Sequence, residues 1–318
     1  MALAITFQSF LHADFWIGVG IVAGIYSIFT LGLQVNVGFT GILNFGQAGF
    51  MAVGAYAMAL LILKAHWSPW AALPTATLIA MLSGLLIGIP ALRIAPHYLA
   101  MATIGAAQIV QIAAQNTGFT GGNEGLIGFD GAWQKIEIWA LDKLSAVGLG
   151  QQYDLPLFLL TWLTFLALLV GLRTLQQTPW GRVLRAIRED EDAVAALGKN
   201  VYAYKLQSLA VAAALGAIAG YLLALNITLV YPQAFSADFT FIGFAILVLG
   251  GLASYVGVAL GSLLLWVVLE GLRFVELPLA ADKVAALRLL LVGLVLIAVM
   301  VLRPQGILGK REEMVIRG

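Results

Sequence analysis

The chain has 318 residues, of which 61% are hydrophobic and only 10% are charged, and its net charge is +1. Soluble domains are roughly 45–50% apolar and about 25% charged, so this composition excludes a soluble globular protein and indicates an integral membrane protein. The basic residues form no arm or stripe, which argues against nucleic acid as a partner. The chain has no cysteine, which excludes disulfides and thiolate metal sites.

Long apolar runs follow one another along the whole chain and predict nine membrane-crossing helices. The first fifteen residues lack the basic start of a cleavable signal, so we expect the N-terminus to be retained. The predicted spans are 16–37, 41–63, 69–90, 98–116, 155–172, 205–227, 239–252, 256–271 and 287–302. These runs lack the alternation of barrel strands. The predicted fold class is therefore all-α, a polytopic helical bundle of about 8–10 transmembrane helices in one domain over residues 1–318.

Two of the predicted spans are expected to be broken or re-entrant. Segment 239–252, FTFIGFAILVLGGL, is short and ends in a glycine pair, and segment 40–61 begins with glycines and polar amides. Short, glycine-interrupted segments point to a binding pathway in transporters. Four glycine pairs at a spacing of four residues predict close helix packing. They are Gly20/Gly24, Gly84/Gly88, Gly216/Gly220 and Gly257/Gly261.

The distribution of Lys and Arg predicts the orientation, because basic loops stay in the cytoplasm. Six basic residues lie from Arg173 to Lys205 and four follow Leu302, whereas loop 117–154 has two against five acids. We therefore expect 174–204 to be a cytoplasmic loop and 117–154 to lie outside. The N-terminus is then outside and the C-terminus inside.

The groups that catalysis or ion coupling would need are missing from the middle of the predicted spans. No carboxylate or histidine lies mid-span, and His12, His66 and His97 are near span ends and far apart in sequence. This argues against an intramembrane enzyme. No G-x-x-x-x-G-K-[ST] phosphate loop is present, so nucleotide chemistry would belong to another subunit.

Segment 180–200, WGRVLRAIREDEDAVAALGKN, is the one crowded patch of charge, with four basic and four acidic residues. Pro179 can open a helix and Gly198 can end it. Val183, Ile187 and Val194 share one face of that helix. We predict a short helix outside the bilayer. Spacing alone favours a plain solvated or lipid-surface helix over one with a specific function.

The stretch GRVLRAIREDEDAVAALGKNVYAYKLQSLAVAAALGAIAG resembles the cytoplasmic loop of the LivH/LivM family, the permeases of branched-chain amino acid ABC importers. Four further stretches are similar to that family in the same order, and mainly to its LivM side: LGLQVNVGFTGILNFGQAGFMAVGAYAMALL, HYLAMATIGAAQIVQ, TGGNEGL and LRPQGILG. The resemblance implies a non-catalytic permease subunit in a bacterial inner membrane. It implies transport of neutral or hydrophobic amino acids from periplasm to cytoplasm, with 117–154 as a periplasmic loop.

The resemblance also implies partners and a coupling site. The expected partners are a second homologous permease in a heterodimer, two ABC ATPase subunits that bind ATP and Mg, and a periplasmic solute-binding protein. No cofactor or metal is expected on this chain. The residues implied to couple it to an ATPase are Arg188, Glu191, Asp192, Ala193 and Gly198. At Asp192 an apolar residue is commoner in the family.

Polar residues placed within spans are candidates for the solute path. The set is Asn44, Phe45, Gln47, Tyr98, Thr103 and Gln108. Backbone amides at the helix start near Asn44 and Gln47 could face a carboxylate, or the side chains could simply bridge helices, worth about 0.6–2 kcal/mol each. In the outer loop, Gly121, Gly122, Asn123 and Glu124 suit either docking of a binding protein or turn chemistry.

Two other transport functions remain open at this stage. Ser and His are frequent in the family where this chain has Asn44 and Gln47, so a same-family permease for urea or a short amide is one alternative. An ion-coupled secondary transporter is the other. The lack of mid-span ionisable residues argues against the second.

Overall fold

The computed structural model describes residues 12–94, 96–146 and 152–271, together with 290, 293–294, 297–298, 301 and 306–308. Helices make up nearly all of it, which confirms the all-α class. The helices are α2 (Ala13–Leu33), the π-helix η1 (Gln34–Thr40), α3 (Gln47–Ala65), α4 (Pro69–Ala91), α5 (Pro96–Asn116), η2 (Gly118–Thr120), α6 (Gly131–Ser145), α7 (Leu155–Gln177), α8 (Pro179–Glu189), α9 (Glu191–Ala196), α10 (Val201–Ile227), η3 (Pro232–Phe235), α11 (Ala237–Gly250) and α12 (Tyr255–Gly271). Two short strands, β1 (Leu126–Ile127) and β2 (Leu229–Val230), pair antiparallel.

Six helices of the described chain are long and apolar enough to cross a membrane, and α12 is a shorter apolar helix. Helix α2 and η1 form one span over Ala13–Thr40. Helix α5 has 21 residues but carries several amides, including Gln108, Gln111 and Gln115. The polytopic membrane fold is thus confirmed. The last predicted span, 287–302, lies largely outside the described residues.

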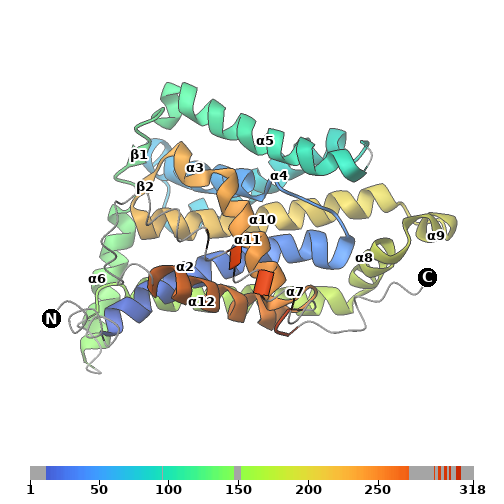
Figure 1. Cartoon of the computed structure of the whole chain (residues 1–318). Helices are drawn as coiled ribbons and strands as arrows, with labels where there is room; N and C mark the ends of the chain where they lie inside the picture. Colours follow the sequence, from blue (N-terminus) through green and yellow to red (C-terminus); the bar gives the residue numbers. More distant parts are fainter. Residues whose placement is uncertain are drawn as a thin grey trace.

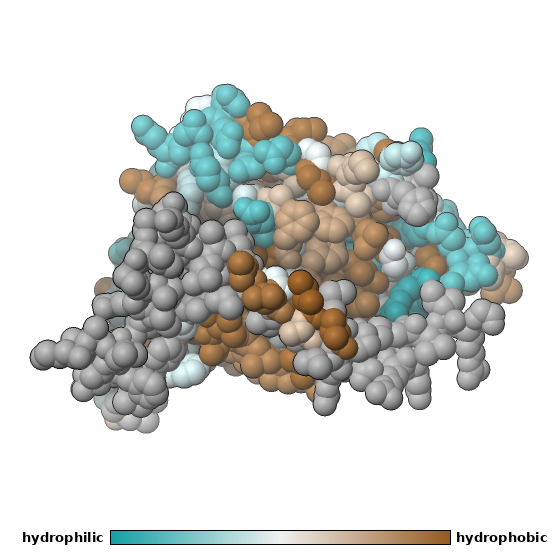
Figure 2. All heavy atoms as spheres, in the orientation of Figure 1, coloured by the Kyte–Doolittle hydropathy of each residue, from teal (hydrophilic) through white to brown (hydrophobic). Residues whose placement is uncertain are grey.

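The helices run between two polar ends of the bundle. Helix α6 and the β1–β2 pair lie at one end, and α8 and α9 lie at the other (Figure 1). Hydrophilic side chains gather over the end of α5 and its following loop and over α8 and α9, with mostly hydrophobic residues between them (Figure 2). The two loops that the charge pattern assigns to opposite sides therefore lie at opposite ends. We call the end with α6 the α6 end, and the other the α9 end.

The centre of the bundle is the packing of α10 against α3, α4 and α2. A Cβ atom added to Gly220 would lie 2.1 Å from the backbone oxygen of Met51, and one added to Gly54 would lie 2.3 Å from the Cα atom of Ala217. Only glycine lets these two backbones come so close. The other predicted glycine pairs also meet a neighbouring helix, so the packing prediction is confirmed.

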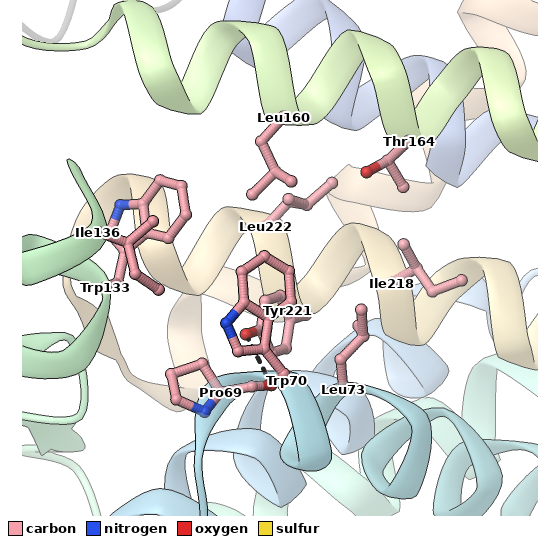
Figure 3. A pocket seen from close by; sticks show the side chains of 10 residues that line it. All are labelled: Pro69, Trp70, Leu73, Trp133, Ile136, Leu160, Thr164, Ile218, Tyr221 and Leu222. Atoms are coloured by element: carbon pink, nitrogen blue, oxygen red, sulfur yellow. Dashed lines mark hydrogen bonds between the residues drawn. The ribbon is translucent and has the colours of Figure 1, made fainter. Parts of the chain in front are cut away.

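Helix α6 packs against α4 and α10 at the α6 end. Trp133 and Ile136 of α6 face Trp70 of α4 and Leu222 of α10 around a cavity of about 30 Å³ (Figure 3). At its edge the Tyr221 hydroxyl donates to the Pro69 carbonyl oxygen at 3.0 Å. The predicted outer loop therefore contains a docked helix, for which we had predicted no element.

The predicted break between the two short spans is confirmed. Helix α11 ends at Gly250, Gly251 has φ +101°, and α12 begins at Tyr255. The carboxamide of Gln34 in η1 lies against this break. With its oxygen facing the break, it accepts from the Ser254 N–H at 2.7 Å.

Three predicted boundaries are wrong for identifiable reasons. Helix α7 continues to Gln177 instead of ending at 172, because Arg173 ends the apolar run but not the helix. Helix α3 begins at Gln47 instead of residue 41, because 41–46 is irregular. The single helix predicted from Pro179 to Gly198 is split at Asp190, which is extended and whose side chain caps α9.

Candidate functional site

The irregular segment 41–46 forms a turn between η1 and α3, in which Ile42, Asn44 and Gly46 are buried and Gly41 and Leu43 are exposed. Gly41 ends η1 with φ +75°. The Asn44 side chain then folds over the start of α3: its Oδ1 accepts from the Gly46 N–H at 2.9 Å, and its Nδ2 donates to Gln47 Oε1 at 3.2 Å. Asn44 and Gln47 are both fully buried. The turn is therefore held by the two amides that the sequence singles out.

This turn also ties α3 to three other helices. Gln47 Nε2 donates to the Ala212 carbonyl oxygen of α10 at 2.8 Å. The Phe45 N–H donates to Thr103 Oγ1 of α5 at 3.0 Å, and the Ala48 N–H donates to Thr240 Oγ1 of α11 at 3.2 Å. The backbone N–H groups of Phe45, Gly46 and Ala48 thus already donate to oxygen atoms of this protein. In this conformation the Gln47 side chain and the N–H groups of Phe45 and Ala48 bridge helices.

The other predicted pathway residues differ in their exposure. Thr103 is buried, whereas Tyr98 is 60% exposed and Gln108 is also exposed. Phe45 is half-buried, and its ring stacks on Phe244 with centroids 4.4 Å apart. The six residues therefore divide into a buried bridging set, an exposed pair on α5, and the half-buried Phe45.

A second buried polar cluster, which the sequence interpretation missed, surrounds the π-helix. Ser208 Oγ lies 2.8 Å from Thr40 Oγ1 and donates to Asn36 Oδ1 at 3.0 Å. Asn36 Nδ2 has no partner within the described part of the chain. Amides and hydroxyls inside an apolar run, as in LQVN, were the available signal. π-Helical turns occur frequently at functional sites.

Helix α8 joins this polar cluster to the α9 end. Arg188 Nη1 donates to the Gly38 carbonyl oxygen of η1. Trp180 Nε1 donates to Gln207 Oε1 of α10 at 2.8 Å. Leu184 and Ile187 form the buried face of α8. Helix α8 is thus fixed to both η1 and α10.

Helix α9 presents a small, mostly solvent-facing surface. Asp190 Oδ1 accepts from the N–H groups of Asp192 and Ala193 at 3.0 Å each, and Glu191 forms an ion pair with Lys205 of α10. Within 191–198 only Val194 is buried. Leu197 is 81% exposed, and Gly198 follows it with φ +77°. The predicted coupling residues 191–193 and 198 thus share one surface with Leu197, which sequence reasoning did not single out.

At the α6 end, the predicted outer-loop residues form a glycine turn. Gly121 and Gly122 have φ +78° and +59°, and Asn123 and Glu124 are exposed. Gln233 Nε2 donates to Asn123 Oδ1 at 3.3 Å. The β1–β2 pair, with Leu126 opposite Val230, fixes the loop to the segment before α11.

A buried carboxyl group in α6 gives this end a dependence on pH. Burial raises the pKa of Glu137 above its ordinary value of 4.5, with the charges of Asp154 and Asp130 adding to the rise and the Tyr153 hydroxyl, which donates to the carboxylate, opposing it. The fold therefore prefers protonated Glu137. The contribution of Glu137 to the free energy of unfolding is therefore fully present below pH 4.5, and it is lost as the pH rises through the raised pKa.

We expect Glu137→Gln to remove this fall in stability. The measurement is the Tm of the purified protein between pH 4.5 and pH 8, with Asp142→Asn, an exposed carboxylate on the same helix, as the matched control. The control should keep the wild-type slope. A wild-type slope in Glu137→Gln would contradict the assignment.

No group of three His, Cys, Asp or Glu side chains is placed to hold a metal ion among the residues that the structure describes. Two sites stand out instead. One is the buried junction at the start of α3 with its exposed neighbours, and the other is the α9 surface.

Comparison with known proteins identifies the family. A model described as branched-chain amino acid transport system, permease component, matches residues 16–300. The chain is 35% identical over 307 residues to the high-affinity branched-chain amino acid transport system permease protein LivM of Escherichia coli (strain K12), covering 89% of this chain and 68% of that protein. It is 36% identical over 300 residues to the LivM protein of Salmonella typhimurium (strain LT2), with the same coverage.

A more distant relative agrees. The chain is 30% identical over 278 residues to the probable branched-chain amino acid transport permease protein LivM of Methanocaldococcus jannaschii, covering 76% of each. No solved structure matches the chain. The resemblance seen in the sequence motifs is confirmed: the chain belongs to the family of branched-chain amino acid transport system permease components.

Proposed function

We propose that this chain is the membrane permease subunit of an ATP-driven importer that moves branched-chain and similar neutral amino acids from the periplasm to the cytoplasm. The observation that carries the proposal is the α9 surface, where an exposed leucine stands among small and acidic side chains at the tip of a bundle. The relatives named as branched-chain amino acid permeases support the substrate class. The alternatives of a urea permease and an ion-coupled transporter are not favoured by these relatives.

We further propose that the α9 end faces the cytoplasm of a bacterial inner membrane and the α6 end faces the periplasm. The six Lys and Arg residues from Arg173 to Lys205, against two in 117–154, support this orientation. The N-terminus is then periplasmic and the C-terminus cytoplasmic. The glycine turn at Gly121–Glu124 lies where a periplasmic solute-binding protein would dock.

In this proposal, two ABC ATPase subunits bind ATP and Mg and hydrolyse ATP, and the chain itself binds no cofactor. One ATPase receives α9 in a surface cleft. Motion of α9 passes to α8, then through the contact of Arg188 with Gly38 to η1. The contact of Gln34 with Ser254 passes it on to the break between α11 and α12. Each link is a direct contact, so docking at one end can shift a broken helix inside the membrane.

The solute path in this proposal follows the exposed side of α5 and Phe45. Tyr98 and Gln108 lie on an exposed face of α5, and polar side chains are costly against lipid. A second permease subunit of the family would cover this face and complete the path. The buried set of Asn44, Gln47 and Thr103 then holds the start of α3 behind the path.

Uptake of labelled leucine by cells that depend on this system tests the function. We expect isoleucine and valine to compete and urea not to compete. Deletion of the chain should abolish the uptake, and a protonophore should leave it largely intact while ATP is maintained. Competition by urea, or collapse of uptake with the proton gradient at constant ATP, would contradict the proposal.

A further inference from the structure

A large cavity lies between α3 and α5, near the α6 end, and belongs to neither proposed site. Its volume is about 630 Å³, whereas the cavity in Figure 3 holds only about 30 Å³. Its walls come mainly from one face of α3, from Val53 to Ala65, and from α5 and η2, from Val110 to Thr120. Ala113, Thr117 and Phe119 are exposed, so the cavity is a groove open along α5. We call it the α3–α5 groove.

The groove has a cationic side chain at one end, and the rest of its wall is mainly apolar. Lys64, in the last turn of α3, is the basic residue of the wall, and its Nζ lies 4.0 Å from the ring centroid of Phe119. No acidic side chain is among the described residues that line the groove. The hydroxyls of Thr117 and Thr120 donate to backbone carbonyl oxygens. The Lys64 ammonium is therefore the polar anchor of this wall.

The dimensions of the groove match one leaflet of a bilayer. Val53 and Lys64 are 11 positions apart, which is roughly 16 Å along a helix. This is about half of a hydrocarbon core that is about 30 Å thick. Lysine near a helix end reaches the headgroup level of a membrane. The cationic end thus lies at headgroup depth and the apolar part at acyl-chain depth.

From this geometry we propose that the α3–α5 groove binds a phospholipid of the leaflet at the α6 end. The phosphate pairs with the Lys64 ammonium at the mouth, and one acyl chain lies along the wall between Leu60 and Val110. A zwitterionic amino acid fits less well, because its ammonium group would meet no carboxylate in the described wall. The proposal does not depend on the transported substrate.

Native mass spectrometry of the purified full chain, titrated with phosphatidylglycerol, tests this assignment. We expect Lys64→Ala to weaken the tightest bound lipid about fivefold, the effect of one lysine near an anionic membrane surface. Ala113→Phe should abolish that binding by placing a phenyl ring in the groove, which Ala113 lines and where its side chain is exposed. Lys143→Ala, which removes a lysine from the last turn of α6, is the matched control and should bind like the wild type.

Four further arms separate the possible occupants: diacylglycerol, glycerol phosphate, competition by leucine, and assembly with the second permease subunit. Diacylglycerol has the acyl chains but no phosphate. Its affinity for the wild type should be no higher than the affinity of phosphatidylglycerol for Lys64→Ala. Glycerol phosphate alone should not bind. Wild-type affinity in both groove variants, displacement of the lipid by leucine, or its loss when the second permease subunit assembles would each overturn the proposal.

Discussion

Replacing Gly220 by leucine should prevent the chain from folding into its helical bundle. A Cβ atom at this position would lie 2.1 Å from the Met51 backbone oxygen of α3, and backbone atoms cannot rotate away as a side chain can. Overpacking of a core costs about 1–3 kcal/mol even where side chains adjust, so we expect at least about 3 kcal/mol here. The measurement is the yield of monodisperse protein in detergent and its Tm.

Gly171→Leu is the matched control. Gly171 lies in α7, is exposed, and has nothing within 4 Å of an added Cβ. The control adds the same side chain to a membrane helix without a clash, so it should fold with a near wild-type Tm. Equal Tm values for the two variants would show that the α3–α10 contact is looser than described.

Replacing Leu197 by aspartate should uncouple the chain from its ATPase partner. Leu197 is the most exposed large hydrophobic residue of the α9 surface, at 81%, and it contacts little within this chain that its loss could disturb. Apolar anchors at the centre of an interface are commonly worth at least about 2 kcal/mol. Docking should therefore weaken about thirtyfold, and ATP-driven uptake should fall below a tenth of wild type.

The control for this prediction is Leu197→Met, which keeps an apolar side chain of similar volume. It should bind the ATPase within about threefold of wild type. Copurification of the ATPase with each variant gives the docking affinity, and the Tm of the isolated chain verifies folding. ATPase binding by Leu197→Asp at wild-type strength would remove Leu197 from the interface.

The membrane fold could be predicted from the sequence because each helix satisfies its own backbone and must be apolar to lie in lipid. The break at Gly250–Gly251 was equally predictable, since consecutive glycines interrupt an otherwise continuous apolar run. The boundary of α7 was not, because Arg173 ends the apolar run while the helix continues to Gln177. The π-helix at Gln34–Thr40 was not predicted, because amides in an apolar run indicate a polar position but do not specify a π-helical turn.

The site residues were predictable as residue types but not by their contacts. Asn44 and Gln47 stand out as amides in an apolar segment, yet the partner of Gln47 is a carbonyl oxygen at Ala212, 165 positions away. Nothing local fixes that contact. Likewise, periodicity predicted Ile187 and Val194 on one face of a single helix. The extended backbone at Asp190, which divides that helix into α8 and α9, was not predicted.

ATP-dependent leucine accumulation by proteoliposomes tests the central claim most directly. The vesicles would contain the assembled importer with either wild-type chain or Leu197→Asp, compared per assembled permease, with ATP on the side of the α9 end. The account predicts that wild type accumulates leucine against its gradient only with ATP, and that Leu197→Asp does not accumulate it. Accumulation without ATP, or equal accumulation by the two chains, would contradict the account.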